Sequence, residues 1–220
     1  MKLSLLPGQK LWFTSDTHYN HSNICSATTN WNVVPDDYRT RDFKSLDSMN
    51  DALVNNINSL VGENDILIHL GDWSFGGFES IAEFRNRIVC KNIHLVLGNH
   101  DQHILNNKNN IRELFSSVHQ YLYLTVTLPQ ASKNQKIEKH NFVCMHYPIA
   151  SWQNLNQGTV HLHGHTHLPP KHRVHKGKAI DVGVDGNVLD PISLQEILSL
   201  VKNNPMTSLS LPLDHHVENL

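Results

Sequence analysis

Five apolar runs in this chain stop at carboxylate, amide or imidazole side chains, and this pattern limits the folds open to it. One run, residues 95–97 (LVL), is followed at once by the string GNHD at residues 98–101. Polar side chains directly after a buried strand cost free energy unless they find partners, so structure alone explains them poorly. The five strings are LWFTSDTH (11–18), DILIHLGD (65–72), IHLVLGNHD (93–101), NFVCMH (141–146) and TVHLHGHTH (159–167).

Between these strings the pattern alternates strand and helix, which predicts an α/β chain whose second half is more purely β, an α+β texture. Residues 43–60 and 78–89 carry apolar side chains at helical spacing. Ser193 and Glu196 have the spacing of a capping box before a last helix, 193–201. We expect strands at 11–15, 65–70, 92–97, 121–128, 141–146, 159–164, 173–175 and 179–182, and long loops at 20–42 and 129–139.

Length and composition predict one ordinary globular domain over residues 1–220, with a loose tail at 203–220. The formal net charge is −2, so bulk charge gives no reason to expect nucleic-acid or anionic-membrane binding. No apolar stretch approaches the roughly 20 residues of a membrane span. The three cysteines, Cys25, Cys90 and Cys144, form no C-x-x-C pair. A reduced, cytoplasmic protein is the expectation.

The strand-end side chains are expected to meet and to bind metal. In open α/β sheets, ligands bind outside the carboxyl ends of the strands. In an extended segment residues i and i+2 point the same way, so Asp16 and His18, like His165 and His167, are expected to act in pairs. Carboxylate, imidazole and amide ligands without cysteine favour Mn²⁺, Fe, Zn²⁺ or Mg²⁺. So many ligand groups are too many for one ion and suit two.

The ordered motifs resemble those of the calcineurin-like metallophosphoesterase superfamily, and in particular a group of small bacterial and phage phosphoesterases. These motifs are D-x-H at 16–18, G-D at 71–72, G-N-H-D at 98–101, a lone His146 and G-H-x-H at 164–167. The resemblance implies a four-layer fold, with two facing mixed sheets and helices outside. It assigns the first metal to Asp16, His18 and His167, the second to Asn99, His146 and His165, and the bridge between them to Asp72.

The resemblance also implies a reaction. A hydroxide shared by two divalent cations would attack phosphorus, with Mn²⁺ as the first choice and Fe, Zn, Ni or Mg as others. His100 would donate a proton to the leaving oxygen, and Asp101 would orient its ring. No arginine closely follows the G-D motif, so His21, Arg39 or Arg41, in the loop after the first strand, is expected to contact the substrate phosphate. For His21, a surface-loop role is the alternative.

The expected substrate is a small soluble phosphodiester, phosphomonoester or nucleotide anhydride. A metal-dependent nuclease is the main alternative, disfavoured by the near-neutral charge. A non-catalytic scaffold would be expected to have lost ligands, and a structural zinc domain would be expected to use cysteine. Trp73 is interpreted as a packing residue, with stacking on a substrate base as the alternative, and His69 and His163 as residues that lie behind the site or in the core. The oligomeric state is left open.

Overall fold

Two five-stranded mixed sheets pack face to face in the computed structural model, which describes residues 1–29, 36–130, 132, 134–172 and 177–205. The β2 sheet has the order β10-β2-β3-β4-β5, and the β7 sheet has the order β1-β6-β7-β8-β9. The strands are β1 (Lys2–Ser4), β2 (Leu11–Thr14), β3 (Ile66–His69), β4 (Asn92–Val96), β5 (Ser117–His119), β6 (Leu122–Thr127), β7 (Lys139–Cys144), β8 (Val160–His163), β9 (Ala179–Asp181) and β10 (Ile192–Ser193). The α-helices are α1 (Leu46–Leu60), α2 (Phe78–Arg87), α3 (Gln102–Leu105) and α4 (Leu194–Val201).

Strand direction brings the strand ends together. Strands β2, β3, β4 and β5 are parallel, and only β10 runs against its neighbour β2. In the β7 sheet, β7, β8 and β9 are parallel in turn. The register is level, because Thr14 pairs with His69 and His69 pairs with Leu95. The carboxyl ends of three strands in one sheet and two in the other therefore deliver the motif loops to one region.

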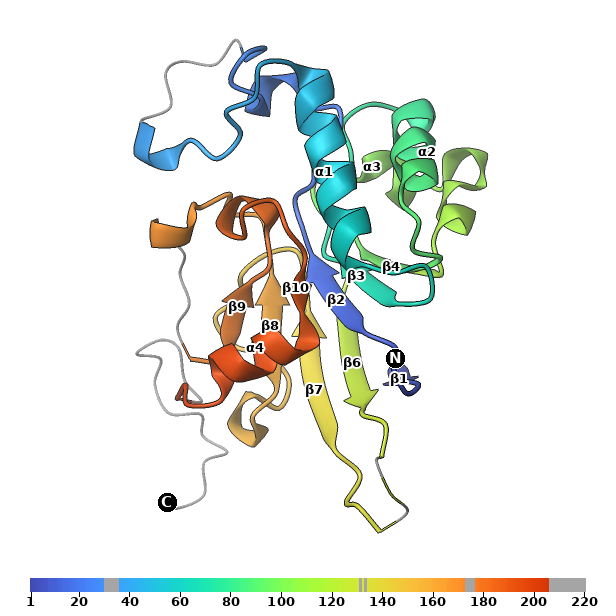
Figure 1. Ribbon diagram of the computed structural model, residues 1–220, viewed down its shortest axis with the longest axis vertical. Helices are drawn as coiled ribbons and strands as arrows, with labels where there is room; N and C mark the ends of the chain where they lie inside the picture. Colours follow the sequence, from blue (N-terminus) through green and yellow to red (C-terminus); the bar gives the residue numbers. More distant parts are fainter. Residues whose placement is uncertain (30–35, 131, 133, 173–176, 206–220) are drawn as a thin grey trace.

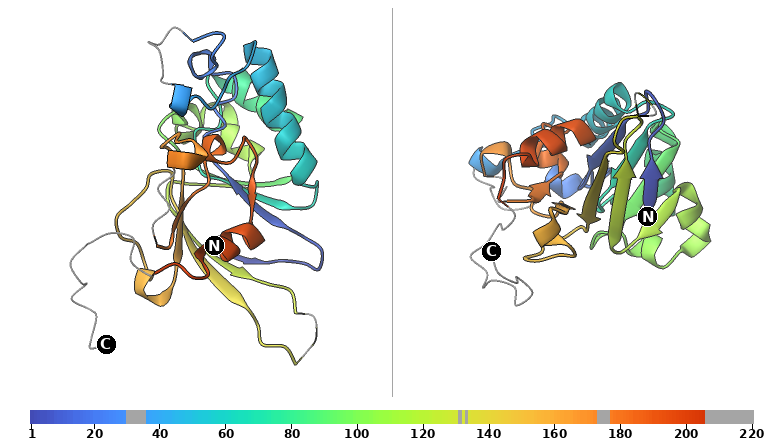
Figure 2. Two further views of the ribbon diagram at one scale, coloured as in Figure 1. Left: turned by 60° about the vertical axis from the view of Figure 1, so that its left-hand side comes forward. Right: turned by 90° about the horizontal axis from the view of Figure 1, so that it is seen from below.

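The core lies between the sheets and under the helices. Phe13 of β2 and Phe142 of β7 meet across the sandwich, with ring centroids 5.6 Å apart. On the other face of the β2 sheet, Leu67 packs with Ile57 of α1 and Phe84 of α2. Figure 1 shows α1 and α2 together on the side of the β2 sheet away from the β7 sheet, and Figure 2 shows the same layers from two other directions. The predicted pair of mixed sheets with flanking helices is confirmed.

Most expected elements are present, with shifted ends. Helix α1 begins at Leu46 rather than 43, because Ser45 caps it and exchanges capping-box hydrogen bonds with Ser48. The Ser193–Glu196 capping box before α4 is confirmed. Strands β1, β5 and β10 and helix α3 were not expected; each is only two to four residues long, too short to show a period.

Some expectations fall beyond the described parts of the chain. The strand expected at 173–175 and the tail from residue 206 lie outside them. The loop at 20–42 contains two short 3₁₀ helices, Ser22–Ile24 and Asp36–Tyr38. All three cysteines are buried and free. No helix among the described residues is both long and apolar enough to cross a membrane.

Candidate metal centre

Seven polar side chains from the ends of five strands converge between the two sheets. The β2 sheet supplies four of them and the β7 sheet three. They are Asp16 and His18 after β2, Asp72 after β3, Asn99 after β4, His146 after β7, and His165 and His167 after β8. The sequence-based prediction that these residues lie together agrees with this geometry.

The first group of side chains contains Asp16, His18, Asp72 and His167. One candidate ligand atom from each lies within 4.8 Å of all the others. The Nε2 atoms of His18 and His167 are 3.1 Å apart, and His18 Nε2 is 3.2 Å from Asp72 Oδ2. Three of these side chains are buried and His167 is half-buried, and such a set of two carboxylates and two imidazoles could hold a divalent ion.

A second group is centred on the Nε2 atom of His146. This atom lies 3.0 Å from Asn99 Oδ1, 3.2 Å from His165 Nδ1 and 3.4 Å from Asp72 Oδ2. The same Asp72 oxygen therefore faces His18 of the first group and His146 of the second. One carboxylate oxygen shared by two groups of donors is the arrangement that a bridging ligand requires.

Backbone amides hold both carboxylates in place. Asp16 Oδ2 accepts a hydrogen bond from the His165 amide at 2.9 Å, and Asp72 Oδ1 accepts one from the His100 amide at 2.9 Å. The remaining oxygen of each carboxylate faces the site. Asp16 Oδ1 is buried with no hydrogen-bond partner, which is costly for a carboxylate unless a cation lies beside it. The donor set and this unpartnered oxygen fit a metal ion.

The backbone is left-handed, not extended, at five of the seven candidate ligand positions. The φ angles are +59° at Asp16, +45° at His18, +55° at Asp72, +71° at His165 and +49° at His167. The side chains of each D-x-H or H-x-H pair therefore converge through tight turns beyond the strand end, and the expected strand alternation is wrong as their cause. Left-handed residues of this kind are uncommon and cluster at functional sites, where the surrounding structure holds them.

Two motif glycines leave room for the carboxylates. A Cβ atom at Gly98 would lie 2.2 Å from Asp72 Oδ1, and one at Gly164 would lie 2.1 Å from Asp16 Oδ2. Real Cβ atoms essentially never approach an oxygen so closely. The glycines of the G-N-H-D and G-H-x-H motifs are therefore required by the neighbouring loop, not by their own turns.

Hydrogen bonds to the far ring nitrogens aim two of the imidazoles. His146 donates from Nδ1 to the Leu70 carbonyl at 2.8 Å, which leaves Nε2 as the lone-pair nitrogen facing the site. Burial alone would lower the pKa of His146, but the Asp72 hydrogen bond and the charges of Asp16 and Asp72 raise it to about 9. A cation at the site would displace that proton, because metal ligands must be deprotonated.

Asp185, which the sequence analysis missed, supports the second imidazole. Its Oδ2 atom lies 2.8 Å from His167 Nδ1, giving the carboxylate–histidine arrangement that orients metal ligands. Burial opposes ionisation of Asp185, but Arg41 and His167 outweigh it and hold its pKa well below the usual range. Asp185 lies in the string GVDGN, beyond the last motif, and only its position in the fold shows its importance.

Arg41 binds protein groups rather than facing the site as a free cation. Its Nε and Nη2 atoms each donate to a carboxylate oxygen of Asp185 at 2.9 Å. Nη1 donates to the Thr17 carbonyl at 2.7 Å, and Nη2 donates to the Asp16 carbonyl at 2.5 Å. The guanidinium is buried and fully engaged. These contacts give Arg41 a positioning role; it also lines the cavity beside the site, and its phosphate contact stays a prediction.

Asp101 likewise has partners other than the expected one. Its Oδ2 atom accepts from the amides of Asp72 and Gly98 at 2.8 Å each, and Oδ1 accepts from the amide of Trp73 at 3.1 Å. The carboxylate joins the G-D loop to the G-N-H-D loop. Because these three donors occupy it, the prediction that Asp101 orients the ring of His100 is replaced by this joining role.

The three residues interpreted as packing are buried. His69 accepts from the Gly71 amide through Nδ1 at 3.2 Å, and its Nε2 lies 2.9 Å from the hydroxyl of Thr17. Burial lowers the pKa of His69 to about 3, so it is neutral. Trp73 is fully buried, and His163 is 2% exposed. These buried side chains pack beneath the motif loops, on the side away from the cavity.

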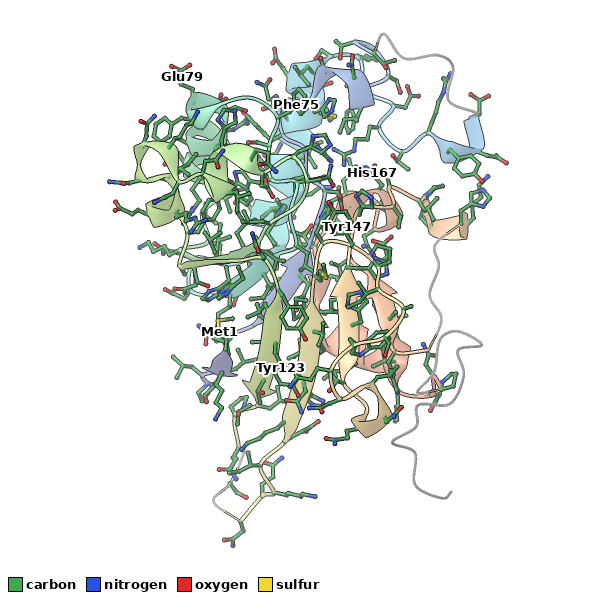
Figure 3. The ribbon with its side chains drawn as sticks, turned by 180° about the vertical axis from the view of Figure 1, so that it is seen from behind. Met1, Phe75, Glu79, Tyr123, Tyr147 and His167 are labelled. Carbon is green, nitrogen blue, oxygen red and sulfur yellow. The ribbon has the colours of Figure 1, made fainter. Side chains whose placement is uncertain are left out.

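His100 and His21 line a cavity of about 620 Å³ that opens beside the two groups of ligands. His100 is exposed, and its ring lies 5.2 Å from that of His18. The His21 ring is buried against Phe75, 3.9 Å away, and burial, followed by the charge of His100, lowers its pKa to about 4. Figure 3 shows Phe75 and Tyr147 on either side of His167. The cavity volume lies within the usual range for small-molecule sites.

Comparisons with known proteins agree with this geometry. The chain is 27% identical over 199 residues to the uncharacterized protein MJ1445 of Methanocaldococcus jannaschii, an alignment that covers 88% of this chain and 92% of that one. Its fold is similar to the crystal structure of the protein of unknown function AQ665 from Aquifex aeolicus, with a TM-score of 0.58, 22% identity, and coverage of 88% of this chain and 100% of that one. Residues 9–188 match the family profile of the calcineurin-like phosphoesterases. The chain therefore belongs to the calcineurin-like phosphoesterase family.

Proposed function

We propose that the protein is a phosphoesterase that uses two divalent metal ions. The observation that carries the proposal is the position of Asp72 Oδ2, 3.2 Å from His18 Nε2 and 3.4 Å from His146 Nε2. The residues that would hold the first ion are Asp16, His18 and His167, and those for the second are Asn99, His146 and His165, with Asp72 shared. Mn²⁺ is the first choice for these ligands, with Fe, Zn, Ni and Mg as alternatives.

Bound divalent ions supply Lewis acidity toward phosphoryl oxygens and lower the pKa of water near them. The protein's own contribution is to fix the donors before substrate arrives. The Asp16 and Asp72 carboxylates are held by backbone amides, and the His146 and His167 rings are aimed by Leu70 and Asp185. A site held in this way does not need to reorganise when the ester reacts.

We assign proton donation to the leaving oxygen to His100, the exposed imidazole at the mouth of the cavity. His21, buried and neutral beside it, is the candidate for contact with a phosphoryl oxygen. The proposed substrates are small phosphodiesters, phosphomonoesters or nucleotide anhydrides, which fit a cavity of about 620 Å³. The free, buried cysteines accord with a cytoplasmic protein.

A metal-reconstituted activity assay tests the proposal. The protein would be stripped with chelator, reloaded with Mn²⁺, and assayed on bis-p-nitrophenyl phosphate and p-nitrophenyl phosphate. We expect hydrolysis that depends on metal and is lost in Asp72→Ala, with two ions per wild-type chain by elemental analysis. Asp190→Ala, a substitution outside the ligand set, is the matched control and should retain activity.

The assay separates the alternatives. Release from the diester identifies a phosphodiesterase, and release from the monoester alone identifies a monoesterase. Metal uptake with no release from either ester would favour an anhydride or nucleic-acid substrate, which a second assay on those compounds decides. A chain that binds no metal and hydrolyses none of these compounds would contradict the proposal.

A further inference from the structure

Tyr38 presents an aromatic ring on the wall of the cavity, across from the metal ligands. It ends the short 3₁₀ helix Asp36–Tyr38 in the loop after β2. The cavity extends from Asp72 and His167 to this wall, and Tyr38 is 43% exposed although it is a large aromatic residue. An exposed aromatic ring lining a cavity is a candidate contact for a flat ligand group.

The ring is held in place before any ligand arrives. Tyr38 stacks on His172, with centroids 4.5 Å apart and planes only 3° from parallel. Next to it, Lys171 Nζ lies 2.5 Å from Asp37 Oδ1, which ties the same two segments together. One face of the Tyr38 ring is thus covered by a parallel imidazole. A preset ring loses little conformational entropy when it binds a ligand.

The wall is also linked to the metal centre. Thr40 and Arg41 both donate hydrogen bonds to Asp185, and Asp185 holds the metal-facing imidazole of His167. The segment that carries Tyr38 is therefore joined to a candidate metal ligand through half-buried Thr40 and buried Arg41 and Asp185. A ligand that spans the distance from the Tyr38 ring to the candidate metal ligands is selected for its length as well as its chemistry.

We propose that the cavity binds a nucleotide, with its base stacked on Tyr38 and its phosphate directed toward Asp72 and His167. Every nucleobase offers a flat face for stacking, and a nucleotide joins that face to phosphate through a short sugar. Arg39 and Thr40, which also line the cavity, provide polar groups along the sugar's path. This inference rests on the proposed phosphoesterase function and names its substrate class.

Two esters with the same leaving group test the inference. Thymidine 5′-(p-nitrophenyl phosphate) and methyl p-nitrophenyl phosphate differ only in carrying a nucleoside or a methyl group. We expect the wild-type kcat/KM ratio, nucleoside ester over methyl ester, to be at least about tenfold, the usual size of one stacked base. The ratio should fall toward unity in Tyr38→Ala and be retained in Tyr38→Phe. Tyr121→Ala is the matched control, because Tyr121 is also 43% exposed but does not line this cavity.

A binding measurement separates this inference from the proposed function. Calorimetry on the Mn²⁺-loaded protein would compare thymidine 5′-phosphate with 2-deoxyribose 5-phosphate, which lacks the base. We expect the nucleotide to bind at least about tenfold more tightly, and Tyr38→Ala to remove the difference. Hydrolysis of both esters with a ratio near unity would overturn the inference and leave the phosphoesterase proposal intact. Base-dependent binding with no hydrolysis of these diesters, of p-nitrophenyl phosphate or of nucleotide anhydrides would contradict the phosphoesterase proposal alone.

Discussion

Gly164 contributes to the metal centre by having no side chain. A Cβ atom at this position would lie 2.1 Å from Asp16 Oδ2 and 2.2 Å from Ser15 Oγ. In Gly164→Ala, we expect the Asp16 carboxylate to leave the His165 amide. Metal affinity at the first group should fall at least about tenfold, as when a ligand loses its support. Overpacking should also cost about 1–3 kcal/mol of unfolding free energy.

Metal titration and chemical denaturation measure these two effects. Gly77→Ala is the control, since a Cβ atom there would meet nothing within 4 Å. If Gly164→Ala bound metal as the wild type does, the close approach would have been relieved by movement elsewhere, and the reason given for this motif glycine would be wrong.

His100 is expected to act in proton transfer and not in metal binding. In His100→Ala, both ions should remain bound while turnover falls by about 10²–10⁴, the usual contribution of a general acid. The loss should be larger for an alkyl ester than for a nitrophenyl ester, because a poor leaving group needs the proton more. Steady-state kinetics with elemental analysis checks both points. Full activity of the variant on an alkyl ester would refute the assignment.

The segment from residue 36 to residue 41, which forms the cavity wall around Tyr38, depends on one buried carboxylate for its position. Asp185 binds Thr40 and Arg41 on one side and His167 on the other. In Asp185→Asn, Arg41 would be buried without its charge partner, at a cost of about 3–5 kcal/mol of stability. Metal affinity should fall by about 10–100-fold. Hydrogen exchange should become faster in the segment from residue 36 to residue 41.

Metal titration and hydrogen-exchange mass spectrometry give the two readouts. Asp190→Asn, a carboxylate of the same segment outside these contacts, should change neither. Weakened metal binding without faster exchange would show that Asp185 supports His167 alone and does not tie the wall to the site.

At the scale of elements, the spacing of apolar residues along the sequence predicted the longer helices and strands. Helices α1, α2 and α4 and the central strands are long enough to bury a face, and a buried face leaves a pattern in the sequence. The motif turns leave none: left-handed angles at Asp16 and His165 follow from contacts between loops far apart in the sequence. For the same reason the partners of Arg41, Asp101 and Asp185 could not be predicted, because each depends on which loops meet.

For the whole molecule, the candidate metal centre joins the two sheets. Each proposed ion takes ligands from both: Asp16 and His18 follow β2 while His167 follows β8, and Asn99 follows β4 while His146 follows β7. Because the unfolded chain does not hold these ligands together, Mn²⁺ at about 100 times its dissociation constant should stabilise the fold by about 2.7 kcal/mol per site. For a chain of this size, that corresponds to an increase in Tm of about 5–10 °C for each ion.

Differential scanning calorimetry with and without Mn²⁺ measures this stabilisation. Asp72→Ala, which lacks the shared carboxylate, should show a much smaller increase, and Asp190→Ala should behave as the wild type does. An unchanged Tm in saturating metal would indicate that the folded protein binds the ions no more tightly than the unfolded chain does.

The left-handed backbone at Asp16 and Asp72 has a consequence for how this chain can evolve. Asparagine is among the few residues that adopt such angles readily, and one base change converts an aspartate codon into an asparagine codon. Such a change would remove a negative charge from the site while leaving the turn that carries it undisturbed. A protein with this substitution would keep the two packed sheets, the cavity and the position of Tyr38 in the cavity wall. Single mutational steps of this kind would exchange the proposed hydrolysis for ligand binding, and reverse the exchange.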